Sequence, residues 1–245
     1  MNLPTEALRD LQRCGPALFR YAVALLLTLC SYHCLAFAVE CYLPEDTFQD
    51  MNALAQLFLA VYFAVAISAA QAVYLAILGA AIDKPLWKYK GAKDALQRFF
   101  VPWLIINLTL ITLLDIQARF EMADRKDIAA FLEFVILAGN VLALPVGGCI
   151  MHWGSLRWNE LGEALRPMAR LFSMMMLPIM VGFMQYTLAR ARFFALTDNM
   201  LFNLMFLIMT DIPLLMIDAY IFTLVWRICM HHRSLPPEND NPFDF

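Results

Sequence analysis

Six long apolar runs constrain this chain more than any other feature of its sequence. A helix needs about 20 residues, at a rise of about 1.5 Å each, to cross a hydrocarbon layer about 30 Å thick. Runs near or above this length cover residues 17–39, 51–82, 99–114, 128–151, 171–188 and 200–228. The chain has 245 residues, of which 62% are hydrophobic, whereas a soluble domain has roughly 45 to 50% apolar residues. We therefore predict an all-α polytopic membrane helix bundle of about six transmembrane helices.

The positive residues predict how this bundle is oriented. Of the 18 Lys and Arg residues, five lie on the side opposite the termini: Arg119, Arg125, Lys126, Arg190 and Arg192. The other 13 lie on the side of the termini, and positive residues near helix ends are retained in the cytoplasm. Both termini are therefore predicted to be cytoplasmic. All five tryptophans fall in the same half, which predicts indole rings at that headgroup level.

This orientation predicts a simple pattern for reporter fusions. A reporter that is active only in the cytoplasm should give signal when it is fused after Lys90, after Glu160 or at the C-terminus. Fusions after Asp46, Asp124 and Asp198 should be silent, because these positions lie on the side that holds only five of the 18 Lys and Arg residues. Reporter activity measured in whole cells checks the prediction. Signal at Asp46 together with silence at Lys90 would invert the orientation.

The chain divides into a long apolar part and a short polar C-terminal segment. Residues 1–233 form the predicted transmembrane domain, and residues 234–245, SLPPENDNPFDF, are rich in Pro, Asn and acidic residues. Such a segment has too little apolar surface to fold alone, so it is expected to be a disordered cytoplasmic tail. It serves either as a solubilising tail or, through its Asn-Pro-Phe triplet, as a docking motif for a partner.

A short pattern recurs before the first, third and fifth apolar runs. Residues 6–9, 94–97 and 163–166 each read acidic, Ala, Leu, polar, and each precedes or adjoins a proline. The pattern predicts three repeated hairpins with interfacial amphipathic segments, although chance recurrence of common residues explains it equally simply. With a long first outer loop and a brief tail, the layout resembles the YciC-like bacterial six-helix membrane proteins. That resemblance implies a bacterial inner (plasma) membrane and brings no biochemical activity with it.

Two acids inside the last apolar run are the most informative polar residues. Asp211 and Asp218 are seven residues apart and lie on one helix face. A charge at the bilayer centre costs about 2.5 to 3.5 kcal/mol, so neither acid should face lipid. Counting residues from the helix ends places Asp211 near the midplane, with Gln71, Asn107 and Asn140 as candidate partners.

This polar cluster supports two readings. In one, Asp211 is a structural carboxyl that hydrogen-bonds neighbouring helices. In the other, the aspartates form a proton or substrate relay. No Lys or Arg inside the apolar runs offers itself as a counter-ion, which favours the structural reading. An aspartate dyad of an intramembrane enzyme would require Asp115 or Glu133 to approach, and the helix depths argue against it.

Soft metal ligands are present but weakly organised. Met176, Met180 and Met184 repeat every four residues, and Cys30, His33 and Cys34 lie within about one turn. Thioethers and thiols bind Cu(I), yet methionine also fills irregular helix contacts, so we predict no metal site and no cofactor. A net charge of -3 and the lack of zinc-finger or RNP-type motifs argue against nucleic acid as a partner.

Enzyme motifs are mostly missing from the sequence. It contains no HExxH, GxSxG or Walker A motif, and no GxGxxG after a strand. We therefore favour a non-enzymatic accessory subunit, or an assembly or homeostasis factor, that acts through helix and tail contacts with the bilayer and a membrane protein partner. The alternative is a small secondary transporter or channel with an intramembrane aspartate relay.

Overall fold

The computed structural model describes residues 2–42, 49–83, 91–154, 160–197 and 199–235. In these ranges the regular elements are helices: α1 (Leu3–Arg13), α2 (Gly15–Tyr42), α3 (Gln49–Ile82), α4 (Ala92–Met122), α5 (Lys126–Trp153), α6 (Leu161–Arg170), α7 (Phe172–Ala191), the 3-10 helix η2 (Arg192–Ala195) and α8 (Met200–Ser234). Helices α2, α3, α4, α5, α7 and α8 are long and apolar enough to cross a membrane. The predicted all-α bundle of six spanning helices is confirmed. The predicted tail lies outside the described residues, apart from Ser234 and Leu235.

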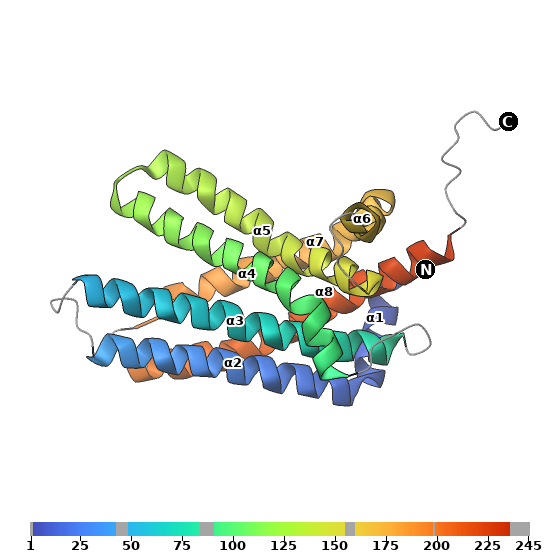
Figure 1. Cartoon of the computed structure of the whole chain (residues 1–245), viewed down its shortest axis with the longest axis horizontal. Helices are drawn as coiled ribbons and strands as arrows, with labels where there is room; N and C mark the ends of the chain where they lie inside the picture. Colours follow the sequence, from blue (N-terminus) through green and yellow to red (C-terminus); the bar gives the residue numbers. More distant parts are fainter. Residues whose placement is uncertain (1, 43–48, 84–90, 155–159, 198, 236–245) are drawn as a thin grey trace.

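The long helices run roughly side by side, and α1 and the C-terminal end of α8 lie at one end of the bundle (Figure 1). We call this the termini end and the opposite one the far end. Helices α2, α3, α4 and α5 contact one another in chain order, while α8 contacts α1, α2, α3, α5, α6 and α7. Because α8 touches elements from both halves of the chain, its polar side chains can meet partners from distant parts of the sequence.

Two of the three predicted interfacial segments are separate helices at the termini end. These are α1 and α6, in which Ala7 and Ala164 are buried and Leu8 is exposed. The third prediction is wrong, because residues 94–97 belong to the continuous helix α4, which passes through Pro102 without ending. A proline inside a helix removes one hydrogen bond but need not end the helix when the turns around it are well packed. Here Phe99 and Trp103, on either side of Pro102, are fully buried.

Tryptophan packing differs from the predicted headgroup belt. Trp103 and Trp226 are 1% and 0% exposed and form part of the core at the termini end. Each indole ring packs on a glycine of a neighbouring helix, Trp103 on Gly147 and Trp226 on Gly79. The glycines leave room for rings that a larger residue would displace, so packing overrides the interfacial preference of tryptophan. Trp153 is 48% exposed, as the prediction requires, and Trp87 and Trp158 lie outside the described residues.

Ion pairs fasten the helices together at the termini end. Arg227 of α8 pairs with Asp10 of α1 through two nitrogens, one of them at 2.7 Å, and lies 3.5 Å from Glu6. Arg233 of α8 donates to Asp83, just after α3, at 2.8 Å. These pairs attach α1 and the end of α3 to α8 at the termini end of the bundle.

Candidate functional site

The five residues of the predicted polar cluster do not form one site. Asn107 of α4 donates to Gln71 of α3 at 2.8 Å and to Ser68 at 2.9 Å. Asn140 donates to the carbonyl of Ile136 in its own helix at 2.9 Å. The structure therefore brings Gln71 and Asn107 together in a contact between α3 and α4. The hydrogen bonds that Asn107 and Asn140 donate go to partners other than Asp211.

Asp218 lies on α8 and accepts a hydrogen bond from a side chain of α7. The side-chain amide of Gln185 donates to its carboxylate at 2.5 Å. Sequence reasoning missed Gln185, although it is a polar residue inside an apolar run and the same argument that selected Gln71 applies to it. This partly buried contact joins two spanning helices.

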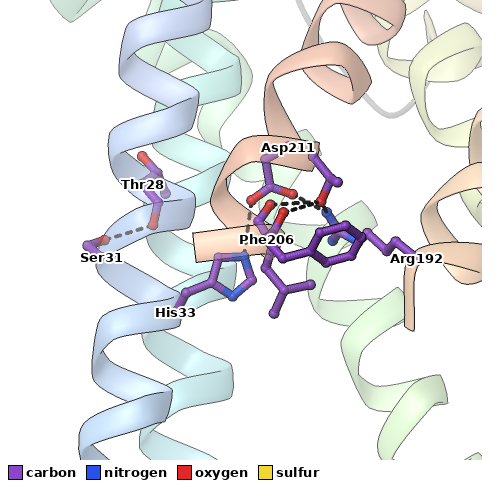
Figure 2. A network of polar contacts seen from close by, with 8 residues as sticks. Thr28, Ser31, His33, Arg192, Phe206 and Asp211 are labelled. Atoms are coloured by element: carbon purple, nitrogen blue, oxygen red, sulfur yellow. Dashed lines mark hydrogen bonds and ion pairs between the residues drawn. The ribbon is translucent and has the colours of Figure 1, made fainter. Parts of the chain in front are cut away.

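Asp211 is the centre of an ionisable cluster drawn from three elements, shown in Figure 2. Its carboxylate pairs with the guanidinium of Arg192, the first residue of η2, and is 3.0 Å from Nε2 of His33 on α2. Arg192 also lies 3.4 Å from the hydroxyl of Thr210. Asp211 is only 2% exposed. We call Asp211, Arg192 and His33 the polar triad.

The polar triad corrects the prediction that Asp211 has no basic counter-ion, because Arg192 is that counter-ion. Arg192 was assigned to an outer connection because it follows the fifth apolar run, and the structure does place it just after α7 ends. Its long side chain reaches back to Asp211, and the Arg192 side chain is 15% exposed. Charge compensation explains why two charged groups can stay away from water. The predicted amide partners are replaced by a cation and an imidazole.

The position of Asp211 along the bundle follows from its contact with Arg192. Helix α7 has 20 residues, about 30 Å of helix and enough to cross the hydrocarbon layer, and Arg192 follows its last residue. Asp211 therefore lies close to the far end of α7. It is also about 24 Å along α8 from Arg227 at the termini end. Helix α8, with 35 residues, is longer than the hydrocarbon layer requires, so counting from its first residue does not by itself fix the depth of Asp211.

The candidate metal ligands are placed apart or engaged elsewhere. Met180 and Met184 are more than 60% exposed on α7, Met176 is 38% exposed, and Cys34 is exposed on α2. His33 faces Asp211, and Cys30, from the same helix, is partly buried. Within the described ranges, no three His, Cys, Asp or Glu side chains are arranged to bind a metal ion.

An apolar groove lies between α5 and α7. It has a volume of about 410 Å³ and is lined by Phe134, Leu137, Ala138, Val141, Ile179, Met180, Phe183 and Met184. A Cβ atom added to Gly182 of α7 would lie 3.4 Å from the backbone carbonyl oxygen of Val141 of α5, so the two helices are close there. The described lining of the groove includes no member of the polar triad.

Comparison with known proteins gives no relative from which a role could be transferred. Neither a family model, nor a curated protein sequence, nor a solved structure matches this chain. The functional argument therefore depends on the geometry alone.

Proposed function

We propose that this protein is a non-enzymatic component of a bacterial inner membrane with both termini in the cytoplasm. It acts as an accessory subunit, or as an assembly or homeostasis factor, through contacts of its helices and tail. The observation that carries this proposal is the apolar groove between α5 and α7. The resemblance in layout to YciC-like proteins supports the choice of membrane.

The groove has the chemistry of a helix-docking surface. Phe134, Met180 and Met184 are all more than 60% exposed along it. Methionine side chains are flexible and polarisable, so they adapt to partners of different shape. In a bilayer, helix association depends on close packing of complementary surfaces, since lipid tails are as apolar as the side chains. A groove of this kind favours the apolar side chains of a partner's transmembrane helix.

The two acids of α8 support the same proposal. The charge of Asp211 is compensated by Arg192, and Asp218 accepts a hydrogen bond from Gln185. A carboxylate paired in this way helps to hold α2, α7 and α8 together. This is the behaviour of a structural group rather than of a group that exchanges protons with a transport path.

Photo-cross-linking in native membranes tests the contact proposal. A photoreactive residue in place of Met184, which is 64% exposed in the groove, should give one defined protein adduct. The matched control is Leu27 of α2, which is 65% exposed and lies outside the groove. Lipid adducts alone at position 184, or the same protein adduct at both positions, would contradict the proposal.

A small secondary transporter is the second candidate function. The contact between His33 and Asp211 favours it, because it joins two polar side chains from different spanning helices inside the bundle. The double variant Arg192→Gln with Asp211→Asn separates the two candidates, since it removes both charges together but keeps polar side chains. An accessory protein should keep its cellular role, whereas a relay centred on Asp211 should lose it while the protein stays folded.

A further inference from the structure

A cavity at the termini end carries more positive than negative charge. It has a volume of about 610 Å³ and lies between α5, α6 and α8. Its described lining includes three arginines, two histidines and one glutamate: Arg166, Arg170, Arg233, His152, His232 and Glu163. A cavity with this balance attracts an anion.

The basic side chains are positioned to donate hydrogen bonds. Arg166 contacts Glu163 at 3.0 Å, and Arg233 contacts Asp83 at 2.8 Å. A guanidinium has five N–H donors, so one carboxylate contact orients the group and leaves further donors for a ligand. Nε2 of His152 is buried and has no hydrogen-bond partner in the described part of the chain. Planar guanidinium groups match the oxygens of a phosphate.

The position of the cavity indicates a lipid source for this phosphate. Helix α6, which forms one wall, lies with α1 at the termini end of the bundle (Figure 1). Trp153, another lining residue, is 48% exposed at the end of α5, which is where an indole marks the headgroup level. Basic pockets between helices at this level bind anionic headgroups. The remaining described lining is largely apolar, with Ala164, Pro167 and Leu235, and suits the glycerol region of a lipid.

We propose that the cavity between α5, α6 and α8 binds the phosphate-bearing headgroup of an anionic phospholipid from the leaflet at the termini end. This inference goes beyond the proposed function and does not depend on it, because the cavity and the α5/α7 groove have different lining residues.

Native mass spectrometry of the delipidated full-length protein tests the site. Dioleoyl phosphatidylglycerol should bind about tenfold or more tightly than dioleoyl phosphatidylcholine, which carries no net charge. The double variant Arg166→Gln with Arg170→Gln should lose this preference. Inorganic phosphate alone should compete only weakly, because it lacks the contacts of the glycerol region. Inorganic phosphate that binds as tightly as phosphatidylglycerol would overturn the lipid assignment in favour of a soluble anion.

Matched variants separate the site from a general effect of charge. The variant Arg119→Gln with Arg125→Gln removes the same charge from exposed positions at the far end and should keep the wild-type preference. Arg166→Gln alone does not put folding at risk, because Arg166 is half-exposed and pairs within its own helix, and it should show part of the loss. Glu163→Gln should bind phosphatidylglycerol at least as tightly as the wild type. The proposal would be overturned if the wild type, the variant Arg166→Gln and the double variant Arg166→Gln with Arg170→Gln all showed the same preference for phosphatidylglycerol over phosphatidylcholine.

Discussion

Replacing Arg192 with glutamine is expected to lower the free energy of unfolding by about 3–5 kcal/mol, because it leaves the buried carboxylate of Asp211 without its cation. Asp211 and Arg192 have side-chain exposures of only 3% and 15%, so water does little to screen the lost charge. Thermal unfolding in detergent should show a melting temperature lower by about 10 °C.

Arg190 provides a matched control two residues earlier. Its ion pair with Glu133 joins side chains that are 47% and 48% exposed. Arg190→Gln should therefore cost less than about 1 kcal/mol, as exposed ion pairs usually do. Equal losses for the two arginine variants would show that Arg192 does not compensate a buried charge.

Neutralising Asp211 in the same molecule should restore most of the stability. Asp211→Asn alone leaves the charge of Arg192 without its counter-ion, so the single variant is expected to be destabilised as well. The double variant removes both charges, and a buried ion pair replaced as a unit often costs little. A thermodynamic cycle of the four proteins measures the coupling between the two side chains. Additive losses would mean that the contact contributes no specific stability.

Gly79→Ala is expected to have the second large effect, a loss of about 1–3 kcal/mol through overpacking. A Cβ atom at position 79 would lie 2.5 Å from the ring of Trp226. That ring has little freedom to move, because it is fully buried and packs against two other rings. Its centroid lies 5.2 Å from the ring centroid of Phe222 and 5.0 Å from that of His152. Thermal unfolding in detergent measures the loss.

Gly162→Ala is the control for this prediction. Gly162 lies in α6 with open space around its Cβ position, so alanine there should be neutral or stabilising through helix propensity. Adding Trp226→Phe to Gly79→Ala should cost less than the sum of the two single changes, since the smaller ring leaves room for the methyl group. Equal stability of the wild type and Gly79→Ala would contradict the tight packing of α3 on α8.

The sequence alone determined the fold class and the approximate spans. Residues 128–151 and 171–188 were predicted as spanning runs, and the helices found are Lys126–Trp153 and Phe172–Ala191. The larger error concerned 99–114, which lies within Ala92–Met122. The apolar run measures only the part that fits the hydrocarbon layer, while the helix continues with polar residues on both sides of it.

The polar residues of the candidate site were found in part. A polar residue inside an apolar run needs a partner, so the sequence could single out Asp211, Asp218, Asn107 and Gln71. Asn107 and Gln71 were placed at similar depth by counting, and they are in contact. Counting gives the depth only where a helix begins at the edge of the hydrocarbon layer, and α8, with 35 residues, is longer than that layer requires.

Only the tertiary structure decided which faces of the long helices contact one another. The long helices are apolar nearly all round, so their sequences do not fix which side of each faces which partner. His33 and Asp211 are 178 positions apart, and their contact depends on how α2 rotates against α8. The reach of Arg192 back from the end of α7 and the packing of Trp226 on Gly79 have the same origin. Hydrophobic length set what crosses the bilayer, and close packing between helices set which side chains meet.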